Sequence, residues 1–340
     1  MVRLMRRTGW IAVVIFLAAC SPKKKLPDVS NIPMPLTLQR FDRDFFAMDT
    51  MHVSHGLDSL QKKYPVFIKD YLYNILAAYP QPDSVLKDVL LFRRTYAPID
   101  SAVQQQFSNV KKYTEQIATA FRYFHYYFPK YNLPHNIITY IGPIEGIGSA
   151  LTSSGLAIGL QAYLGHQFPT YHTQYIYIRE VYPDYETRRF EPEYITVNCM
   201  RNILSDYYPE KKAGMPLIEQ IIESGKRMYV LDACLPNVAD SIKTGYTQTQ
   251  LSGCYAHEKN IWSFFIQNNL LYETEPTQIA PYVNDGPGTP ELGPAAPGNI
   301  GLFTGWQIVK QWMKKHPGTS PEQLLETPSK QIFDEAKYQP

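Results

Sequence analysis

Long apolar runs and cysteines are scarce in this sequence. After residue 20 no segment stays apolar for 18 residues or more, which argues against a second membrane-spanning helix. Only four cysteines occur, and three of them, Cys199, Cys234 and Cys254, lie beyond Cys20. An odd number of cysteines is not a disulfide framework. A single bridge between Cys234 and Cys254 stays open, with buried free thiols as the alternative.

The common catalytic motifs are also missing. The chain has no G-x-S-x-G nucleophile elbow, no G-x-x-x-x-G-K phosphate loop and no G-x-G-x-x-G after a strand. A zinc-peptidase helix needs two histidines four residues apart, and Ile261 stands four residues after His257. His166 and His172 lie six residues apart with no acidic third ligand beside them in the sequence. The histidines therefore predict no metal site, and the residues indicate no cofactor.

Net charge gives little support for a nucleic-acid partner. Without the three arginines of residues 1–20, the remaining 30 basic and 31 acidic side chains give a net charge of −1. Nucleic-acid binding requires a basic surface that neutralises phosphates. The abundant tyrosine (26) and proline (27) instead suit a globular extracytoplasmic protein with rigid connections.

The first 20 residues have the layout of a secretory signal. Three arginines precede a short apolar stretch, which ends in Leu17-Ala18-Ala19-Cys20. A cysteine at the cleavage point is typical of bacterial lipoproteins, in which its thiol is acylated. The prediction is a signal peptide over residues 1–19, a lipidated tether over 20–37 and a single globular domain over 38–340. An ordinary signal peptide with a chance cysteine is the alternative.

The rest of the chain alternates helical and strand patterns. Apolar residues at helical spacing predict helices near 57–76, 85–92, 103–128, 192–204, 217–222, 261–265 and 306–312. β-branched residues predict strands at 136–141 and 156–160, with a small-residue turn at 145–155 between them. The expected fold is α+β, predominantly helical with a small central sheet.

The most distinctive internal segment is Pro297-Gly298-Asn299-Ile300-Gly301 and the residues that continue it to Val309. Gly301 and Gly305 lie one turn apart on one helix face, and Trp306 follows. Glycine weakens a helix, so two on one face suggest that another backbone comes close. One interpretation is a partner-docking groove at Gly301, Gly305 and Trp306; the favoured alternative is tight packing inside the domain.

The chain resembles the gliding-motility lipoprotein GldB family. The match is carried by the lipobox at Cys20 and by a series of short motifs in the right order, namely Phe41-Asp42-Arg43-Asp44-Phe45, Tyr64-Pro65-x-Phe67, Ile158-Gly159-Leu160-x-x-Tyr163-Leu164-Gly165, Gly225-Lys226-x-x-Tyr229, Glu258-Lys259-x-Ile261-Trp262, Leu270-Leu271-Tyr272 and the 297–309 segment. Asn299 departs from the arginine expected in the last motif.

This family in turn looks like a distant relative of zincin-type metallopeptidases. The resemblance would place Asn198 and Asn202 at the two zinc histidines, and Cys199 at the glutamate base. Neutral amides bind zinc poorly, and a thiol does not replace a carboxylate base. The resemblance thus implies a degenerate metallopeptidase scaffold without the chemistry; a plain amphipathic helix explains the same residues.

Two functions follow as expectations. The leading one is a non-enzymatic lipoprotein that is held to the outer membrane by its acyl anchor. It would act through contacts with envelope proteins in gliding motility, type 9 secretion or general envelope assembly. Lysines rather than an acidic run follow Cys20, which favours the periplasmic face. The alternative is a zincin-like metallopeptidase with an atypical metal site that includes His166, His172 or His257. A carbohydrate- or peptide-binding lipoprotein is a weaker third interpretation.

Overall fold

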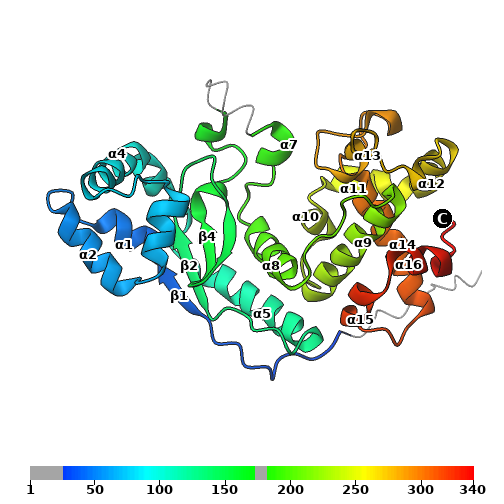
Figure 1. The fold of residues 1–340 in the computed structure, drawn as a ribbon, viewed down its shortest axis with the longest axis horizontal. Helices are drawn as coiled ribbons and strands as arrows, with labels where there is room; N and C mark the ends of the chain where they lie inside the picture. Colours follow the sequence, from blue (N-terminus) through cyan, green and yellow to red (C-terminus); the bar gives the residue numbers. More distant parts are fainter. Residues whose placement is uncertain (1–25, 173–181) are drawn as a thin grey trace, which may run out of the picture.

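The computed structural model describes residues 26–172 and 182–340, which form helical layers around one small sheet (Figure 1). Cys20 lies outside the described residues. The four strands are β1 (Thr37–Arg40), β2 (Asn136–Tyr140), β3 (Ser149–Thr152) and β4 (Gly155–Gly159). Their order is β1-β2-β4-β3; β1, β2 and β4 run parallel, and β3 is antiparallel at one edge. The predicted α+β class with a small central sheet is confirmed.

The helices before β2 are α1 (Phe41–Ala47), α2 (Val53–Lys63), α3 (Phe67–Lys69), the π-helix η1 (Asp70–Ile75), α4 (Pro82–Gln106) and α5 (Lys111–Tyr127). After β4 come η2 (Leu160–Ala162), η3 (Pro169–His172), α7 (Asp184–Thr187) and α8 (Tyr194–Tyr207). The remaining helices are α9 (Leu217–Cys234), α10 (Asp240–Thr244), α11 (Gln248–Ala256), α12 (Glu258–Gln267), η4 (Leu270–Tyr272), α13 (Pro276–Val283), η5 (Pro290–Leu292), α14 (Ile300–Lys315), α15 (Pro321–Glu326) and α16 (Ser329–Ala336).

Both faces of the sheet are buried, because successive side chains of a strand point to opposite sides. Ile138 and Tyr140 of β2 pack with the aromatic cluster of α1 to α4. Ile137 of β2 and Leu156 of β4 pack on the other side, against α5 and α8. Figure 1 shows the same layers, with α1, α2 and α4 on one side of the sheet and α5 and α8 on the other. The central strands β2 and β4 therefore consist mainly of apolar and β-branched residues.

Helices α9 and α14 form the centre of the C-terminal half. The amino-terminal part of α9 and most of α14 belong to a second apolar cluster with α11, α12, α13 and α16, whereas the end of α9 joins the sheet-side cluster. Helix α9 thus contributes to both cores and connects them.

Two predicted boundaries were wrong. The helix expected over 103–128 is divided, because α4 ends at Gln106 and α5 begins at Lys111. The Asn109 side chain accepts a hydrogen bond from the backbone N–H of Lys111 (2.9 Å) and so offers the first turn of α5 a partner. The expected turn at 145–155 contains β3, which forms a tight hairpin with β4 through the pair Thr152 and Gly155.

The segment before β1 lies on the body of the protein. Val29 is buried in the sheet-side core, and Arg122 of α5 donates a hydrogen bond to the carbonyl of Ile32 (3.0 Å). Figure 1 shows this segment running along the underside of the molecule from the region of α15 to β1. The part of the predicted tether from residue 26 onward is therefore packed against the domain.

Candidate functional site

Helix α8 carries the residues that the metallopeptidase resemblance singled out. Asn198 and Asn202 lie one turn apart and face the sheet edge. The Asn198 amide donates to the Tyr163 hydroxyl (3.1 Å) and the Asn202 amide donates to the Ser149 hydroxyl (2.9 Å). Both amides thus connect α8 by hydrogen bonds to the β3–β4 hairpin and to the turn that follows it.

Cys199 points into the apolar core and is completely buried. Burial raises the pKa of its thiol well above the ordinary value, because a thiolate is poorly stabilised without water. The two amides are weak zinc ligands and the Cys199 thiol is enclosed in the core, and the zincin-like scaffold is not confirmed.

The histidines are not gathered around one point. His166 pairs with Glu191, and a ring nitrogen of His172 lies 2.5 Å from the carbonyl oxygen of His166. His257 stands elsewhere, at the junction of α11 and α12. Across residues 26–172 and 182–340, no group of three or more histidine, cysteine, aspartate or glutamate side chains is placed to hold a metal ion. The geometry gives no support to the metallopeptidase alternative.

Gly301, Gly305 and Trp306 are buried between helices of the same chain. A Cβ on Gly301 would lie 2.7 Å from the Tyr282 carbonyl oxygen, and one on Gly305 would overlap the backbone of Ile221 in α9. Trp306 has no exposed surface. Helix α9 therefore covers the face on which a partner was considered, and the two glycines provide the close packing that was the favoured interpretation.

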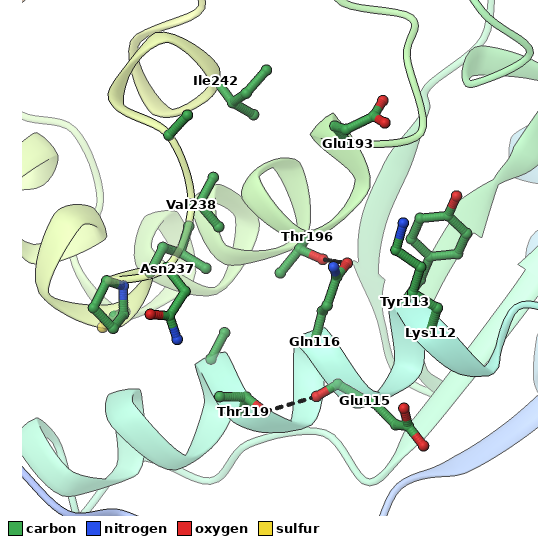
Figure 2. Close-up of a pocket in the computed structure, with 15 residues that line it drawn as sticks. Lys112, Tyr113, Glu115, Gln116, Thr119, Glu193, Thr196, Asn237, Val238 and Ile242 are labelled. Atoms are coloured by element: carbon green, nitrogen blue, oxygen red, sulfur yellow. Dashed lines mark hydrogen bonds between the residues drawn. The ribbon is translucent and has the colours of Figure 1, made fainter.

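All three described cysteines are free and buried, so Cys234 and Cys254 are not bridged. Cys234 instead lines a groove of about 510 Å³ between α5, α8 and the loop from α9 to α10 (Figure 2). Sequence reasoning did not find this groove, because its three walls come from segments far apart along the chain.

The groove is lined by apolar and polar side chains together. Its apolar members include Ala120, Leu235, Val238 and Ile242. Thr196 of α8 donates a weak hydrogen bond to Gln116 of α5 (3.4 Å), and Figure 2 shows Lys112 and Glu193 at one end. The pKa of Tyr113 is raised, first by burial and then by the charge of Glu193. A concave lining of apolar side chains with a few polar groups suits a surface that receives an apolar side chain of a partner.

The fold and this groove define a class: an α+β domain with a mixed sheet between helical layers and an open surface groove. Within the described part of the chain, no helix is long and apolar enough to cross a membrane. The chain belongs to the family described as gliding motility protein GldB, whose family model matches residues 22–340. No curated protein and no solved structure gives a significant match. The resemblance seen in the sequence is confirmed, and family membership fits an envelope-anchored lipoprotein associated with gliding motility.

Proposed function

We propose that this protein is a non-enzymatic lipoprotein of the outer membrane that acts through protein contacts on the periplasmic face. Its partners would be components of gliding motility, of type 9 secretion or of general envelope assembly, and residues 38–340 would act as one unit. The observation that carries the proposal is the family match over residues 22–340, which begins two residues after Cys20, the cysteine that follows the predicted signal peptide. The neutral, hydrogen-bonded amides of Asn198 and Asn202 support a role without metal chemistry.

The anchor would hold the domain close to the bilayer. Five residues separate Cys20 from Leu26, where the described chain begins. Six Cα–Cα steps join these two positions, and at roughly 3.5 Å per step they reach about 20 Å at most. The underside of the molecule, along which residues 26–36 run, would therefore be the face nearest the lipid (Figure 1).

Replacing Cys20 tests the anchor. In Cys20→Ser the acyl acceptor is lost, so we expect no labelling with radioactive fatty acid and a shift from the membrane to the soluble fraction. Lipid chains on one residue supply about 0.8 kcal/mol per buried CH₂, and nothing else in the proposal holds the domain in the bilayer. Cys254→Ser keeps Cys20 and serves as the control. Unchanged labelling of Cys20→Ser would contradict the anchor, and loss of wild-type protein to protease added to intact cells would contradict the periplasmic face.

The groove between α5, α8 and the α9–α10 loop is the proposed contact surface. Its occupant would be an apolar side chain presented by a segment of an envelope protein, because the lining combines apolar side chains with hydrogen-bonding groups and charges. Binding of a partner in this groove and anchoring through Cys20 are independent properties, so either can be absent when the other is present.

Val238→Glu tests the contact. A carboxylate in the groove would be buried without a partner upon binding, which costs at least about 1.4 kcal/mol and weakens binding tenfold or more. A photo-crosslinking residue at Asn237, an exposed residue of the groove lining, reports the contact in the native envelope. Leu91→Glu, at an exposed site on α4, is the matched control. We expect the crosslinked product to disappear only with Val238→Glu; equal yields in both variants would contradict the proposal.

A further inference from the structure

A second cavity, of about 210 Å³, lies between α8, α9 and the loop that precedes α14. Three cationic side chains line it: Arg201 of α8, Arg227 of α9 and Lys212 of the loop that joins these helices. Two carboxylates, Glu210 and Asp285, are also in the lining. Neither the family description nor the lipid anchor accounts for this concentration of charge.

Both carboxylates already form ion pairs. Glu210 lies 3.3 Å from Lys212 and 3.5 Å from Arg227, while Asp285 forms a two-pronged pair with Arg189, with a shortest distance of 2.6 Å. Arg201 forms no ion pair with a carboxylate among the described residues; its hydrogen bond goes to the backbone carbonyl of Lys243 (2.8 Å). Asp285 acts on Arg201 only from beyond ion-pair distance, so one lining guanidinium group lacks a direct counter-ion.

The surroundings add charges to those of the lining. Arg188 and Arg189 stand near Asp285, so five cationic side chains lie around Glu210 and Asp285, and Glu223 acts on Arg227 from farther away. The Arg188 Nε is buried and has no hydrogen-bond partner in the described structure. Burial lowers the pKa of Arg201, and the charge of Arg189 lowers it further. Partly desolvated cations that repel one another are costly unless an anion compensates them.

The cavity also offers uncharged hydrogen-bonding groups. The Asn299 side chain lines it, and its buried Oδ1 lacks a partner in the described structure. Rotation of this amide exchanges oxygen for the NH₂ group, so Asn299 can donate to an anion. Ser205 adds a hydroxyl to the lining, whereas the Thr244 hydroxyl already donates to the carbonyl of Asp240 (2.8 Å). The volume equals that of about seven waters, which is enough for one hydrated phosphoryl group and less than the roughly 300 Å³ of a small-molecule pocket.

We propose that this cavity binds a phosphate-like oxyanion, held by the guanidinium groups of Arg201 and Arg227 and by the ammonium group of Lys212. Planar guanidinium groups match the oxygens of a phosphoryl group, and each such bond is charge-assisted. The bound anion would connect α8 and α9 to the loop before α14. Free inorganic phosphate and a phospholipid headgroup present the same chemistry.

Phosphate titration of the full lipidated chain in neutral detergent tests the site. The melting temperature is measured against phosphate concentration, with chloride keeping the ionic strength constant. A ligand that binds only the folded state raises this temperature as its concentration exceeds the dissociation constant. We expect a saturable rise for the wild type, and at least a tenfold weaker phosphate dependence for Arg201→Gln. Arg94→Gln, an exposed arginine on α4, is the matched control and should behave as the wild type.

Two further measurements keep the test decisive if Arg201→Gln folds poorly. Phosphorus NMR of inorganic phosphate with the wild type should show line broadening that Lys212→Gln reduces. Soluble dihexanoyl phosphatidic acid, compared with dihexanoyl phosphatidylcholine, then distinguishes a headgroup from free phosphate as the source. An effect of phosphatidic acid supports a headgroup, and an effect of phosphate alone supports the free ion. No stabilisation and no broadening by either would overturn the proposal, as would equal responses in Arg201→Gln and Arg94→Gln.

Discussion

Gly305→Ala is expected to lower the free energy of unfolding by at least about 3 kcal/mol, the scale of overpacking in a tightly packed core. Gly305 lies where α14 crosses α9, and a Cβ there would overlap the carbonyl group of Ile221. Gly225 of α9 is the reciprocal position, since its Cβ would overlap the backbone of Gly305. The obstacle is main chain on both sides, so no rotation of a side chain can relieve it. The helices must separate and open the apolar cluster between them.

Gly253→Ala is the matched control for this experiment. Gly253 lies inside α11, and nothing stands within 4 Å of the Cβ that the substitution would add. Alanine favours a helix over glycine by up to about 1 kcal/mol, so this variant should be neutral or more stable. Urea unfolding followed by circular dichroism measures both variants. A Gly305→Ala protein as stable as Gly253→Ala would show that α9 and α14 do not pack backbone to backbone.

The sequence predicts the central elements of this fold better than its edges. Strands β2 and β4 are buried on both faces, so their apolar and β-branched residues make a local signal that survives without tertiary information. Strand β3 has the sequence Ser149-Ala150-Leu151-Thr152 and lies at the sheet edge. It is a strand because β4 pairs with it; three of its four residues are small or polar and glycines stand on either side, so the segment is typical of a turn when that partner is unknown.

The same distinction applies to the candidate sites. Helical spacing places Asn198 and Asn202 on one face, as the sequence implies, but it does not reveal that Tyr163 and Ser149 occupy their amides. The groove and the cavity require segments to meet that lie tens of residues apart. Arg189 and Asp285, for example, are 96 residues apart in the chain. No local sequence pattern indicates a contact between residues so far apart in the chain. The two glycines of α14 do indicate close packing against another backbone, because glycine destabilises a helix and is otherwise unfavourable there.

Lys226→Met is expected to cost about 3–5 kcal/mol of unfolding free energy, because it leaves Glu223 as a buried charge without a counter-ion. The Lys226 side chain is almost completely buried (2% exposed) and lies 2.7 Å from the carboxylate of Glu223. Its ammonium group also donates to the carbonyls of Leu325 (3.0 Å) and Thr327 (3.1 Å). These hydrogen bonds connect α9 to α15 and to the turn before α16. The substitution should therefore weaken the packing of these helices as well as remove the ion pair with Glu223.

Lys330→Met provides the comparison, since it breaks an ion pair of similar length in water. Lys330 and Asp334 are 2.9 Å apart on α16, and both side chains are more than half exposed. Exposed pairs at this spacing contribute about 0.5 kcal/mol or less, so Lys330→Met should unfold almost like the wild type. In the double variant Lys226→Met with Glu223→Leu no buried charge remains, and we expect it to regain part of the stability that Lys226→Met loses. If the double variant is no more stable than Lys226→Met, the unpaired charge of Glu223 does not account for the loss; a lower stability would reflect the hydrogen bonds that Glu223 accepts from Tyr208 and Ser329. If Lys226→Met and Lys330→Met unfold alike, Lys226 is in contact with water and the connection from α9 to α15 does not depend on it.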